Sequence, residues 1–335
     1  MVSLRKRLKQ YGRPLAAFWR ELSIASDQVT ARLRRADLSF FFEFHRPPYG
    51  GGNQFLRALW AEFERRGLRL ENNTISHTTR ACLYNSYNFD FERLRRLYLV
   101  GCRMVHRVDG PITVYRGRDD GSDQRIWQIN QELADATIFQ SHYSLQKHLE
   151  LALEFKSPCV IMNAADPQIF HPHGRVPFSR QRKIRIISTS WSDNPNKGAA
   201  TYKWLENHLA WNKFEYTFVG RSQIQFEQIR MLDPMPSAPL AELLRQHDIF
   251  IIASRHDPCS NALIEALSCD LPAIYLCSGG HPEIVGEAGF GFTNAEQIPK
   301  LLDRLVTEYE DRQARISLPT LTEVADRYLD VIGIE

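Results

Sequence analysis

From residue 38 onward, short apolar runs alternate with longer stretches whose apolar positions recur every three or four residues. Runs of this length are typical of buried strands, and the recurrent spacing is typical of helices. Strands are predicted at 38–44, 102–110, 134–141, 183–189, 214–220, 248–253 and 272–276. Helices are predicted at 54–66, from 145 onward, around 202–205, at 239–246 and at 321–331. Strands that alternate with helices indicate a parallel sheet and the α/β fold class.

This pattern occurs in two successive halves of the chain. The segment 171–183 separates them, and its content of Pro, Arg and Gly is typical of a linker. We therefore predict two Rossmann-like domains, at 37–172 and 183–318, whose strand ends face one another across a cleft. Residues 1–36 form a separate, basic helical segment in this interpretation.

Composition limits the functional classes. A chain of 335 residues with 43% hydrophobic and 24% charged residues is long enough for two domains and is typical of a globular protein. Its net charge of +3 permits anionic ligands without requiring nucleic acid. No aromatic–basic sheet motif or recognisable reading helix favours a nucleic-acid binder. The six cysteines contain no CxxC pair, so we expect free thiols and a cytoplasmic protein.

The N-terminal segment has two interpretations. It lacks the apolar core of a signal peptide, and no apolar run approaches the roughly 20 residues that span a bilayer. Apolar residues lie among its Arg and Lys residues at helical spacing: Leu4, Leu8, Leu15, Phe18, Trp19 and Leu22. One interpretation is a surface helix packed on the first domain. The other is an interfacial helix on anionic lipid, that is, a peripheral membrane contact through residues 1–36.

Two carboxylates follow the run at 248–253. Asp257 stands in the turn after the strand, and Glu265 stands inside the helix that begins near residue 260. A helix N-terminus attracts phosphate, and carboxylates accept hydrogen bonds from sugar hydroxyls. A strand, a turn and a helix with carboxylates at these places are therefore typical of a site for a polyhydroxylated, anionic ligand.

A glycine-rich turn follows the first predicted strand. Gly50, Gly51 and Gly52 stand between the 38–44 strand and the 54–66 helix. Glycines let a ligand approach bare backbone, and such turns face phosphates at the carboxyl ends of α/β sheets. A permissive loop without a ligand is the alternative, and the position after the first strand favours the binding role.

Together these motifs resemble the retaining glycosyltransferases of family 4 (glycosyl transferases group 1), which have the GT-B fold. That family carries two Glu residues separated by seven others, and this chain has Asp257, seven residues and Glu265. Further motifs follow the family order: Ala134-Asp135 to Ser141, Asn163 with Asp166, Phe170 and Pro172, Lys197-Gly198, and Gly279-Gly280 with Pro282-Glu283. The resemblance covers nearly the whole chain from residue 38. It implies that a C-terminal helix, at 319–335, packs back on the first domain.

The resemblance also implies roles for individual residues. Gly51 and Gly52 would approach the donor phosphates or the acceptor, and Lys197 would pair with the diphosphate and stabilise the leaving group. Asp257 would hydrogen-bond hydroxyls of the donor sugar, and Glu265 would bind the ribose hydroxyls. Backbone N–H groups near the helix start would assist Asp257: those of Cys259, Ser260 and Asn261.

Three positions depart from the family pattern. Asp257 replaces the usual Glu and is shorter by one methylene, and Pro258 replaces the usual Gly and removes a backbone donor. Ser192 stands where the family usually has an Arg five residues before its phosphate Lys, and Arg221 is the candidate substitute. These departures leave the identity of the donor open and do not alter the expected fold.

A polar group of the first domain should meet the donor sugar. The family often has a His at a strand end here, and three residues of the 102–110 strand compete for this catalytic role: His106, Arg107 and Asp109. The register does not decide between them.

The sequence therefore predicts a retaining glycosyltransferase that moves a sugar from a nucleotide-sugar donor to an acceptor hydroxyl of a glycan or lipid-linked acceptor, as in surface polysaccharide assembly. The resemblance implies that no metal and no other cofactor is needed, and the acidic run at 119–123 is interpreted as a turn. Two alternatives remain open: a nucleotide-sugar epimerase on the same scaffold, and a catalytically inert nucleotide- or sugar-binding module. The sugar, the base, the acceptor and the oligomeric state are not specified.

Overall fold

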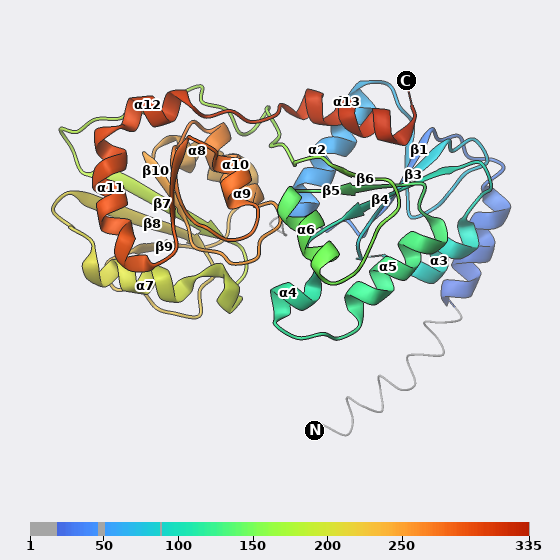
Figure 1. Ribbon diagram of the computed structural model, residues 1–335. Helices are drawn as coiled ribbons and strands as arrows, with labels where there is room; N and C mark the ends of the chain where they lie inside the picture. Colours follow the sequence, from blue (N-terminus) through green and yellow to red (C-terminus); the bar gives the residue numbers. More distant parts are fainter. Residues whose placement is uncertain (1–18, 46–50, 88, 335) are drawn as a thin grey trace, which may run out of the picture.

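The computed structural model describes residues 19–45, 51–87 and 89–334. They form two lobes side by side, each built around one sheet with helices on both faces (Figure 1). The first half of the chain forms one lobe, and the strands from residue 184 onward form the other. This is the two-domain α/β architecture expected from the sequence.

Over the described ranges each sheet has six strands, and every strand pair is parallel. The first sheet has the order β2-β1-β3-β4-β5-β6, with β1 at Leu38–Phe41, β2 at Leu70–Asn72, β3 at Ala81–Asn85, β4 at Arg103–Val108, β5 at Ala136–Phe139 and β6 at Pro158–Val160. The second has the order β12-β11-β10-β7-β8-β9, with β7 at Ile184–Ser190, β8 at Phe214–Gly220, β9 at Arg230–Leu232, β10 at Ile249–Ile252, β11 at Ala273–Leu276 and β12 at Gly289–Phe292.

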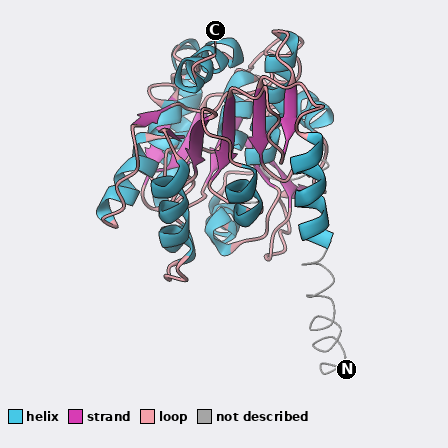
Figure 2. Cartoon of the chain, turned by 90° about the vertical axis from the view of Figure 1, so that its right-hand side faces the viewer, coloured by secondary structure: helices cyan, strands magenta, loops and turns pink. Residues whose placement is uncertain are grey.

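Helices pack on the sheets of both lobes, and Figure 2 shows them around the strands of the first lobe. In that lobe they are α2 at Gly51–Arg65, α3 at Phe91–Leu97, α4 at Ile112–Arg116, α5 at Ser122–Leu133 and α6 at His142–Glu150. In the second they are α7 at Ala199–His208, α8 at Ser237–Arg245, α9 at Asn261–Ser268, α10 at His281–Val285, α11 at Ile298–Thr307 and α12 at Tyr309–Ala314. The last helix is α13 at Leu321–Ile332.

The strands are buried because helices cover both faces of each sheet. Every side chain of β1, β3, β5 and β10 is buried. Strands in this position need nearly continuous apolar runs, since strict alternation would place polar groups under a helix. Many of the polar side chains therefore gather beyond the strand ends.

Helix α13 crosses from the second lobe back to the first (Figure 1). Its buried residues, among them Val324 and Tyr328, share one apolar core with α2 and the first sheet. Thr320 and Glu323 form a capping box at its start, and Gly333 ends it in the left-handed conformation, with a φ of 73°. The second half of the chain thereby completes the core of the first lobe.

Most predicted elements lie within about three residues of their observed positions, as for the strand predicted at 38–44, which ends at Phe41. The apolar pattern does not predict β3, although this strand lies between β1 and β4 in the sheet. Its Cys82, Tyr84 and Asn85 make the run too polar to stand out, and neighbouring helices bury all five residues nonetheless.

A helix at residues 19–30 packs beside α3. The Gln28 side chain donates to the Arg96 carbonyl at 3.2 Å, and Arg93 pairs with Asp27. Residues 1–18 of the N-terminal segment, which was predicted at 1–36, lie outside the described residues. Within the described ranges, no helix is long and apolar enough to cross a membrane.

A buried carboxylate in α7 holds the chain between β8 and β9. The Glu206 Oε1 atom accepts hydrogen bonds from the backbone N–H groups of Glu227, Gln228 and Ile229 at 2.7, 2.7 and 2.9 Å. The Lys203 ammonium donates to the other oxygen at 2.6 Å. Burial alone would raise the pKa of Glu206, but the ammonium and the N–H groups lower it overall.

Replacing Glu206 with Ala should lower the free energy of unfolding by about 3 kcal/mol, because buried N–H groups lose their acceptor. Denaturant unfolding of E206A and wild type measures the difference. E227A is the matched control, because the Glu227 side chain is 85% exposed and its backbone N–H is retained. Its unfolding free energy should stay within about 0.5 kcal/mol of wild type. Equal stability of E206A and wild type would contradict this role of Glu206.

Candidate active site

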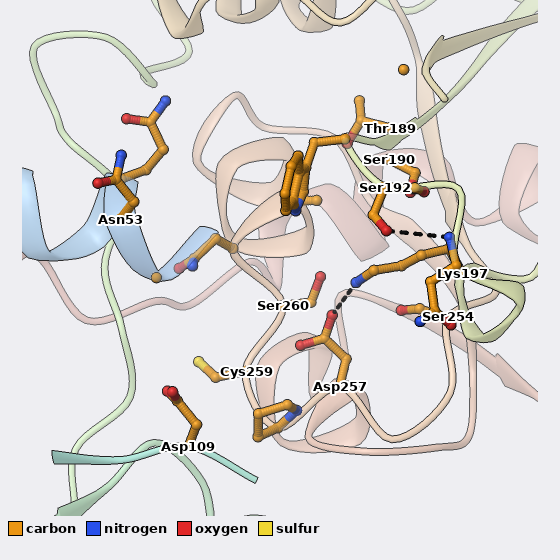
Figure 3. A pocket seen from close by; sticks show the side chains of 18 of the residues that line it. Asn53, Asp109, Thr189, Ser190, Ser192, Lys197, Ser254, Asp257, Cys259 and Ser260 are labelled. Carbon is orange, nitrogen blue, oxygen red and sulfur yellow. Dashed lines mark hydrogen bonds and ion pairs between the residues drawn. The ribbon is translucent and has the colours of Figure 1, made fainter. Parts of the chain in front are cut away.

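A cleft of about 880 Å³ lies between the two lobes. Loops at the carboxyl ends of β1, β3, β4 and β5 form one wall, and loops after β7, β8 and β10 form the other. Open α/β sheets bind ligands at this edge, where helix N-termini and polar side chains gather. The cleft is therefore the candidate site, and Figure 3 shows part of its lining.

Asp257 lies in the tightly folded loop between β10 and α9. His256, just before it, is in the left-handed conformation with a φ of 57°. Gly279 and Gly280 pack on this loop: a Cβ at Gly279 would lie 2.1 Å from the Asp257 carbonyl oxygen, and one at Gly280 would lie 2.3 Å from that of Pro258. Both positions therefore require glycine, which accounts for the glycine pair downstream of the acidic motif.

Lys197 ends a short 3-10 turn, Pro195–Lys197, between β7 and α7. Gly198 follows with a φ of 83°, and a Cβ there would lie 2.4 Å from the carbonyl oxygen of Ala253. The glycine thus lets the loop after β7 pack directly on the end of β10. This close approach brings Lys197 beside Asp257.

Lys197 and Asp257 form an ion pair inside the cleft, with Nζ 3.1 Å from Oδ2 (Figure 3). Burial alone would lower the pKa of Lys197 and raise that of Asp257. Their mutual attraction outweighs burial, so the pKa of Lys197 is raised and that of Asp257 is lowered. Both groups stay charged, and Lys197 is available to any anion that competes with the carboxylate.

The start of α9 faces the cleft beside this pair. Cys259, Ser260 and Asn261, whose N–H groups the resemblance assigns to the donor, all line it. Ser260 is the N-cap residue but its side chain makes no capping hydrogen bond, so the first N–H groups of the helix remain available to an anion. Burial raises the pKa of the Cys259 thiol to about 12, so this thiol is neutral and not a nucleophile.

Glu265 lies farther along α9, on the same wall of the cleft. Burial raises the pKa of its carboxyl group to about 8. The group therefore holds a proton at neutral pH. A ligand that donates hydrogen bonds to the carboxylate form would displace that proton.

Asp109 brings a carboxylate to the cleft from the first lobe, on the opposite side of the pocket from Lys197 (Figure 3). It follows β4, and its side chain is 28% exposed. Arg107 Nη1 donates to its Oδ1 at 3.1 Å, and Asn85 Nδ2 donates to its Oδ2 at 3.1 Å. Gln140 also donates to Oδ1. The carboxylate is thus held firmly by its own lobe.

The other two first-lobe candidates do not line the cleft. His106 is fully buried, its ring stacks on Tyr84 with centroids 4.3 Å apart, and its Nδ1 lies 3.1 Å from the Asn130 amide. Burial lowers its pKa to about 3, so it is a neutral core residue, which corrects the catalytic interpretation. Arg107 is also fully buried, and its guanidinium donates to Asp109 and Asn85, which line the cleft.

Of the remaining residues predicted to bind the donor, some line the cleft and others do not. Gly52 lines the cleft, and Gly51 is the first residue of α2. Arg221 is exposed and is not among the lining residues, and its backbone N–H donates to the Ser190 carbonyl at 2.8 Å. It does not replace the missing family Arg in this arrangement, and Ser192 itself lines the cleft.

Several lining residues have no counterpart in the sequence prediction. They are polar or aromatic groups beside strand ends: Asn53, Gln54, Asn85, Tyr87, Tyr115, Arg116, Gln140, Thr189, Ser190, Trp191 and Asn194. Gln140 could have been found, because it stands at the end of the strand predicted at 134–141. Asn85 could not, because the strand that it ends is not predicted.

Direct contacts join the lobes around the cleft. The Glu283 carboxylate of α10 accepts hydrogen bonds from the N–H groups of His142 and Tyr143, at the start of α6, at 2.8 and 2.7 Å. The Tyr143 hydroxyl lies 3.1 Å from His256 Nδ1. These contacts join the two lobes directly, with Asp109 facing the wall that the second lobe forms.

Comparison with known sequences gives a family match within the second lobe. Residues 206–311, in the second lobe, match the family model described as glycosyl transferases group 1. No curated protein sequence matches the chain significantly.

Solved structures resemble both lobes together. Sucrose-phosphate synthase from Thermosynechococcus elongatus has a TM-score of 0.69 at 13% identity, over 89% of this chain and 98% of its own. Anabaena HepE in complex with UDP-glucose has 0.66 at 14%, over 89% and 100%. The catalytic domain of starch synthase IV from Arabidopsis thaliana, bound to ADP and acarbose, has 0.68 at 11%, over 90% and 99%. The chain therefore has the two-domain GT-B fold of glycosyltransferases, with residues 206–311 matching the group 1 glycosyl transferases.

Proposed function

We propose that this protein is a retaining glycosyltransferase of family 4, which transfers a sugar from a nucleotide-sugar to an acceptor hydroxyl. The observation that carries the proposal is the placement of Lys197, Asp257 and Glu265 along one wall of the cleft, with Asp109 on the other. HepE and the starch synthase domain, which share the fold, are bound to UDP-glucose and ADP. A nucleoside diphosphate sugar suits the cationic and hydroxyl-binding groups that line this cleft.

The diphosphate would lie between Lys197 and the start of α9. A diphosphate carries more negative charge than one carboxylate, so Lys197 would turn from Asp257 to the phosphates. The N–H groups at Ser260 and Asn261 would add hydrogen bonds at the helix N-terminus. These groups stabilise the charge that develops on the diphosphate as it leaves.

The two carboxylates would then hold hydroxyl groups at separate places. Asp257, freed from Lys197, would accept hydrogen bonds from the transferred sugar. Glu265 would accept hydrogen bonds from the ribose once its proton is lost. Because Asp257 is one methylene shorter than the usual Glu, the sugar would sit closer to the loop that follows β10.

The acceptor would enter along the first lobe, where Asp109 would orient the sugar or the incoming hydroxyl. The acceptor oxygen forms its bond to the anomeric carbon on the face from which the diphosphate departs. The electron pair of the broken C–O bond goes to the diphosphate, and the acceptor proton passes to a diphosphate oxygen. The configuration is retained. The proposal assigns charge neutralisation to Lys197 and α9, and it includes no metal or other cofactor.

The proposal also places the protein in the cytoplasm, peripherally bound to the membrane through the helix at 19–30 and the turn after it. One face of this helix, with Ile24, is buried against the first lobe. The opposite face carries Leu22, Val29 and Leu33, which are 46%, 73% and 81% exposed. We name these three residues the outer stripe. An apolar stripe on the outer face of a surface helix indicates a partner.

Charge around the outer stripe favours anionic lipid as that partner. Arg32 and Arg35 are exposed near it, and neither forms an ion pair within residues 19–45, 51–87 and 89–334. Basic residues near an anionic bilayer each contribute about 1 kcal/mol. The preceding sequence contains more of them: Arg5, Lys6, Arg7, Lys9 and Arg13.

The donor site is tested first with nucleotides. One of UDP, GDP, ADP and TDP should stabilise the protein, by about 2.7 kcal/mol when present at 100 times its dissociation constant. Lys197→Ala should weaken that binding by about 2 kcal/mol, roughly thirtyfold, because a charge-assisted contact to phosphate is lost. Thermal unfolding with and without each nucleotide measures the stabilisation, and titration calorimetry measures the affinity. Lys213→Ala, on an exposed lysine paired with Asp303, is the control and should bind as wild type does.

Three results would contradict this assignment in different ways. Folded protein that binds none of the nucleotides has no donor site in the cleft. Isomerisation of the bound nucleotide-sugar without acceptor identifies an epimerase. Binding without nucleotide release, for every acceptor class offered, identifies an inert binding module.

Nucleotide binding at neutral pH should release a proton from Glu265. Its pKa of about 8 leaves it mostly protonated in the free protein, and ribose hydroxyls donate to its carboxylate form, so binding lowers that pKa. Affinity should therefore rise with pH up to that pKa. Calorimetry of UDP binding in buffers of different ionisation enthalpy counts the protons. Glu265→Gln should release fewer protons than wild type, by up to about one. Equal proton release by the two proteins rules out this role.

Membrane binding is tested with vesicles. The protein should sediment with vesicles of phosphatidylcholine and phosphatidylglycerol, and not with phosphatidylcholine alone. Val29→Ser combined with Leu33→Ser should lower partitioning at least about tenfold, because two apolar side chains no longer enter the bilayer. Leu149→Ser, at a 45% exposed position on α6, is the control and should leave partitioning unchanged. A dimer that the double variant disrupts, or vesicle binding that it does not change, overturns the lipid assignment.

A further inference from the structure

Arg107 is a fully buried cation at the centre of a polar network beneath the cleft. Its guanidinium donates hydrogen bonds to Asn85 Oδ1 at 2.7 Å, Asp109 Oδ1 at 3.1 Å, Asn163 Oδ1 at 2.9 Å and Tyr328 Oη at 3.2 Å. These partners come from β3, from the loops that follow β4 and β6, and from α13. One side chain thus connects segments that are far apart in the sequence.

The charge of Arg107 sets the orientation of the amides around it. A guanidinium donates hydrogen bonds and accepts none, so an amide that meets it must present its oxygen. Asn85 therefore turns its NH₂ group to Asp109 Oδ2, at 3.1 Å. Asn163 likewise turns its NH₂ group to Gln140 Oε1, at 3.0 Å. The NH₂ group of Gln140 is then left to donate to Asp109. Three amide orientations follow from one cation.

In the first lobe the network ends on Asp109. Its Oδ1 accepts from Arg107 and Gln140, and its Oδ2 accepts from Asn85. Its backbone N–H donates to Ser86 Oγ at 2.5 Å. Donors therefore hold both carboxylate oxygens in one orientation before any substrate arrives.

The same network crosses to the second lobe. Asn163 Nδ2 also donates to Asn261 Oδ1, at 3.1 Å. Asn261 is the first residue of α9 and lines the cleft. Because its oxygen is bonded to Asn163, its NH₂ group is the side left to donate to a ligand, which suits a phosphate or hydroxyl oxygen.

A gain in the stability of the fold is a weak explanation for the burial of Arg107 in this network. Transfer of a charged group from water into a protein interior costs several kcal/mol, and apolar residues of similar volume are often as stable. Both ends of the network, Asp109 and Asn261, lie on the cleft walls. The geometry thus points to a role in the cleft.

We propose that Arg107 is a positioning residue: it sets the orientation of Asp109 and, through Asn163, of the Asn261 amide at the start of α9. Arg107 does not touch the substrate. It couples the acceptor-side carboxylate to a donor-side amide across the closed cleft. This inference rests on the proposed function, because it assumes a nucleotide-sugar bound at α9.

Asn163→Asp is the sharpest test. The aspartate keeps the size of the side chain and still accepts from Arg107, but it cannot donate to Gln140 or Asn261. UDP release from UDP-glucose should slow about 100-fold in kcat, the usual cost of misplaced reacting groups. KM for UDP-glucose should change less than about threefold, because the ion pair and Glu265 remain in place. A general loss of structure would not separate the two constants in this way.

Two further variants separate charge from packing. Arg107→Met should be as slow as Asn163→Asp or slower, and Arg107→Lys should recover part of the loss because it restores a buried cation. Tyr328→Phe is the matched control: it removes one hydrogen bond to Arg107 and leaves the amide orientations unchanged, so kcat should stay within about twofold of wild type. Thermal unfolding of each variant confirms that it is folded.

The results distinguish this inference from the proposed function. If wild type neither binds UDP by calorimetry nor releases it from UDP-glucose, while no other nucleotide class replaces UDP, the proposed function fails. If wild type releases UDP from UDP-glucose and Asn163→Asp does so with the same kcat, the positioning role fails. A crystal structure of Asn163→Asp decides the geometry in either case. Unchanged orientations of Gln140, Asp109 and Asn261 in that structure would overturn the inference.

Discussion

The arrangement of this molecule depends on one constraint: both sheets are entirely parallel, and helices cover both of their faces. The strand faces must then be filled mainly by apolar side chains, so polar groups concentrate at the strand ends. Parallel strands bring their carboxyl ends to one edge of a sheet, and the two sheets present these edges to each other. Residues as distant in sequence as Asn85, Lys197 and Asp257 therefore line one cleft.

The two walls of that cleft compensate buried charge in different ways. On the second lobe, Lys197 has one anionic partner, Asp257, at 3.1 Å, and a ligand can replace it. On the first lobe, Arg107 is surrounded by acceptors of the protein itself and has no exposed surface. In the proposed function Lys197 would exchange Asp257 for the phosphates of the substrate, whereas Arg107 keeps the same partners throughout. A site that must bind and release a charged ligand while keeping its geometry needs one ion pair that can exchange partners and one that cannot.

The fold and the second-lobe wall of the cleft could be predicted largely from the sequence, because their signals are local. Asp257, Glu265 and Lys197 each stand in the loop or helix that follows a predicted strand, and each is found at the cleft. The first-lobe wall could not be predicted, because its signals are long-range. His106 and Arg107 are consecutive on β4, and their roles depend on which residues pack beside each of them. The hydroxyl that meets Arg107 comes from Tyr328, on a helix at the other end of the described chain.

The return of α13 to the first lobe has a consequence for biosynthesis. A ribosome makes the strands of the first sheet before those of the second, and domains usually fold as their residues emerge. Here the first lobe lacks Val324, Tyr328 and the rest of α13 until the whole second lobe has been made. Its apolar surface around Phe55 stays uncovered during that interval, and Arg107 lacks one of its hydrogen-bond acceptors. The part synthesised first is therefore completed last, and the nascent chain must remain soluble with an unfinished core.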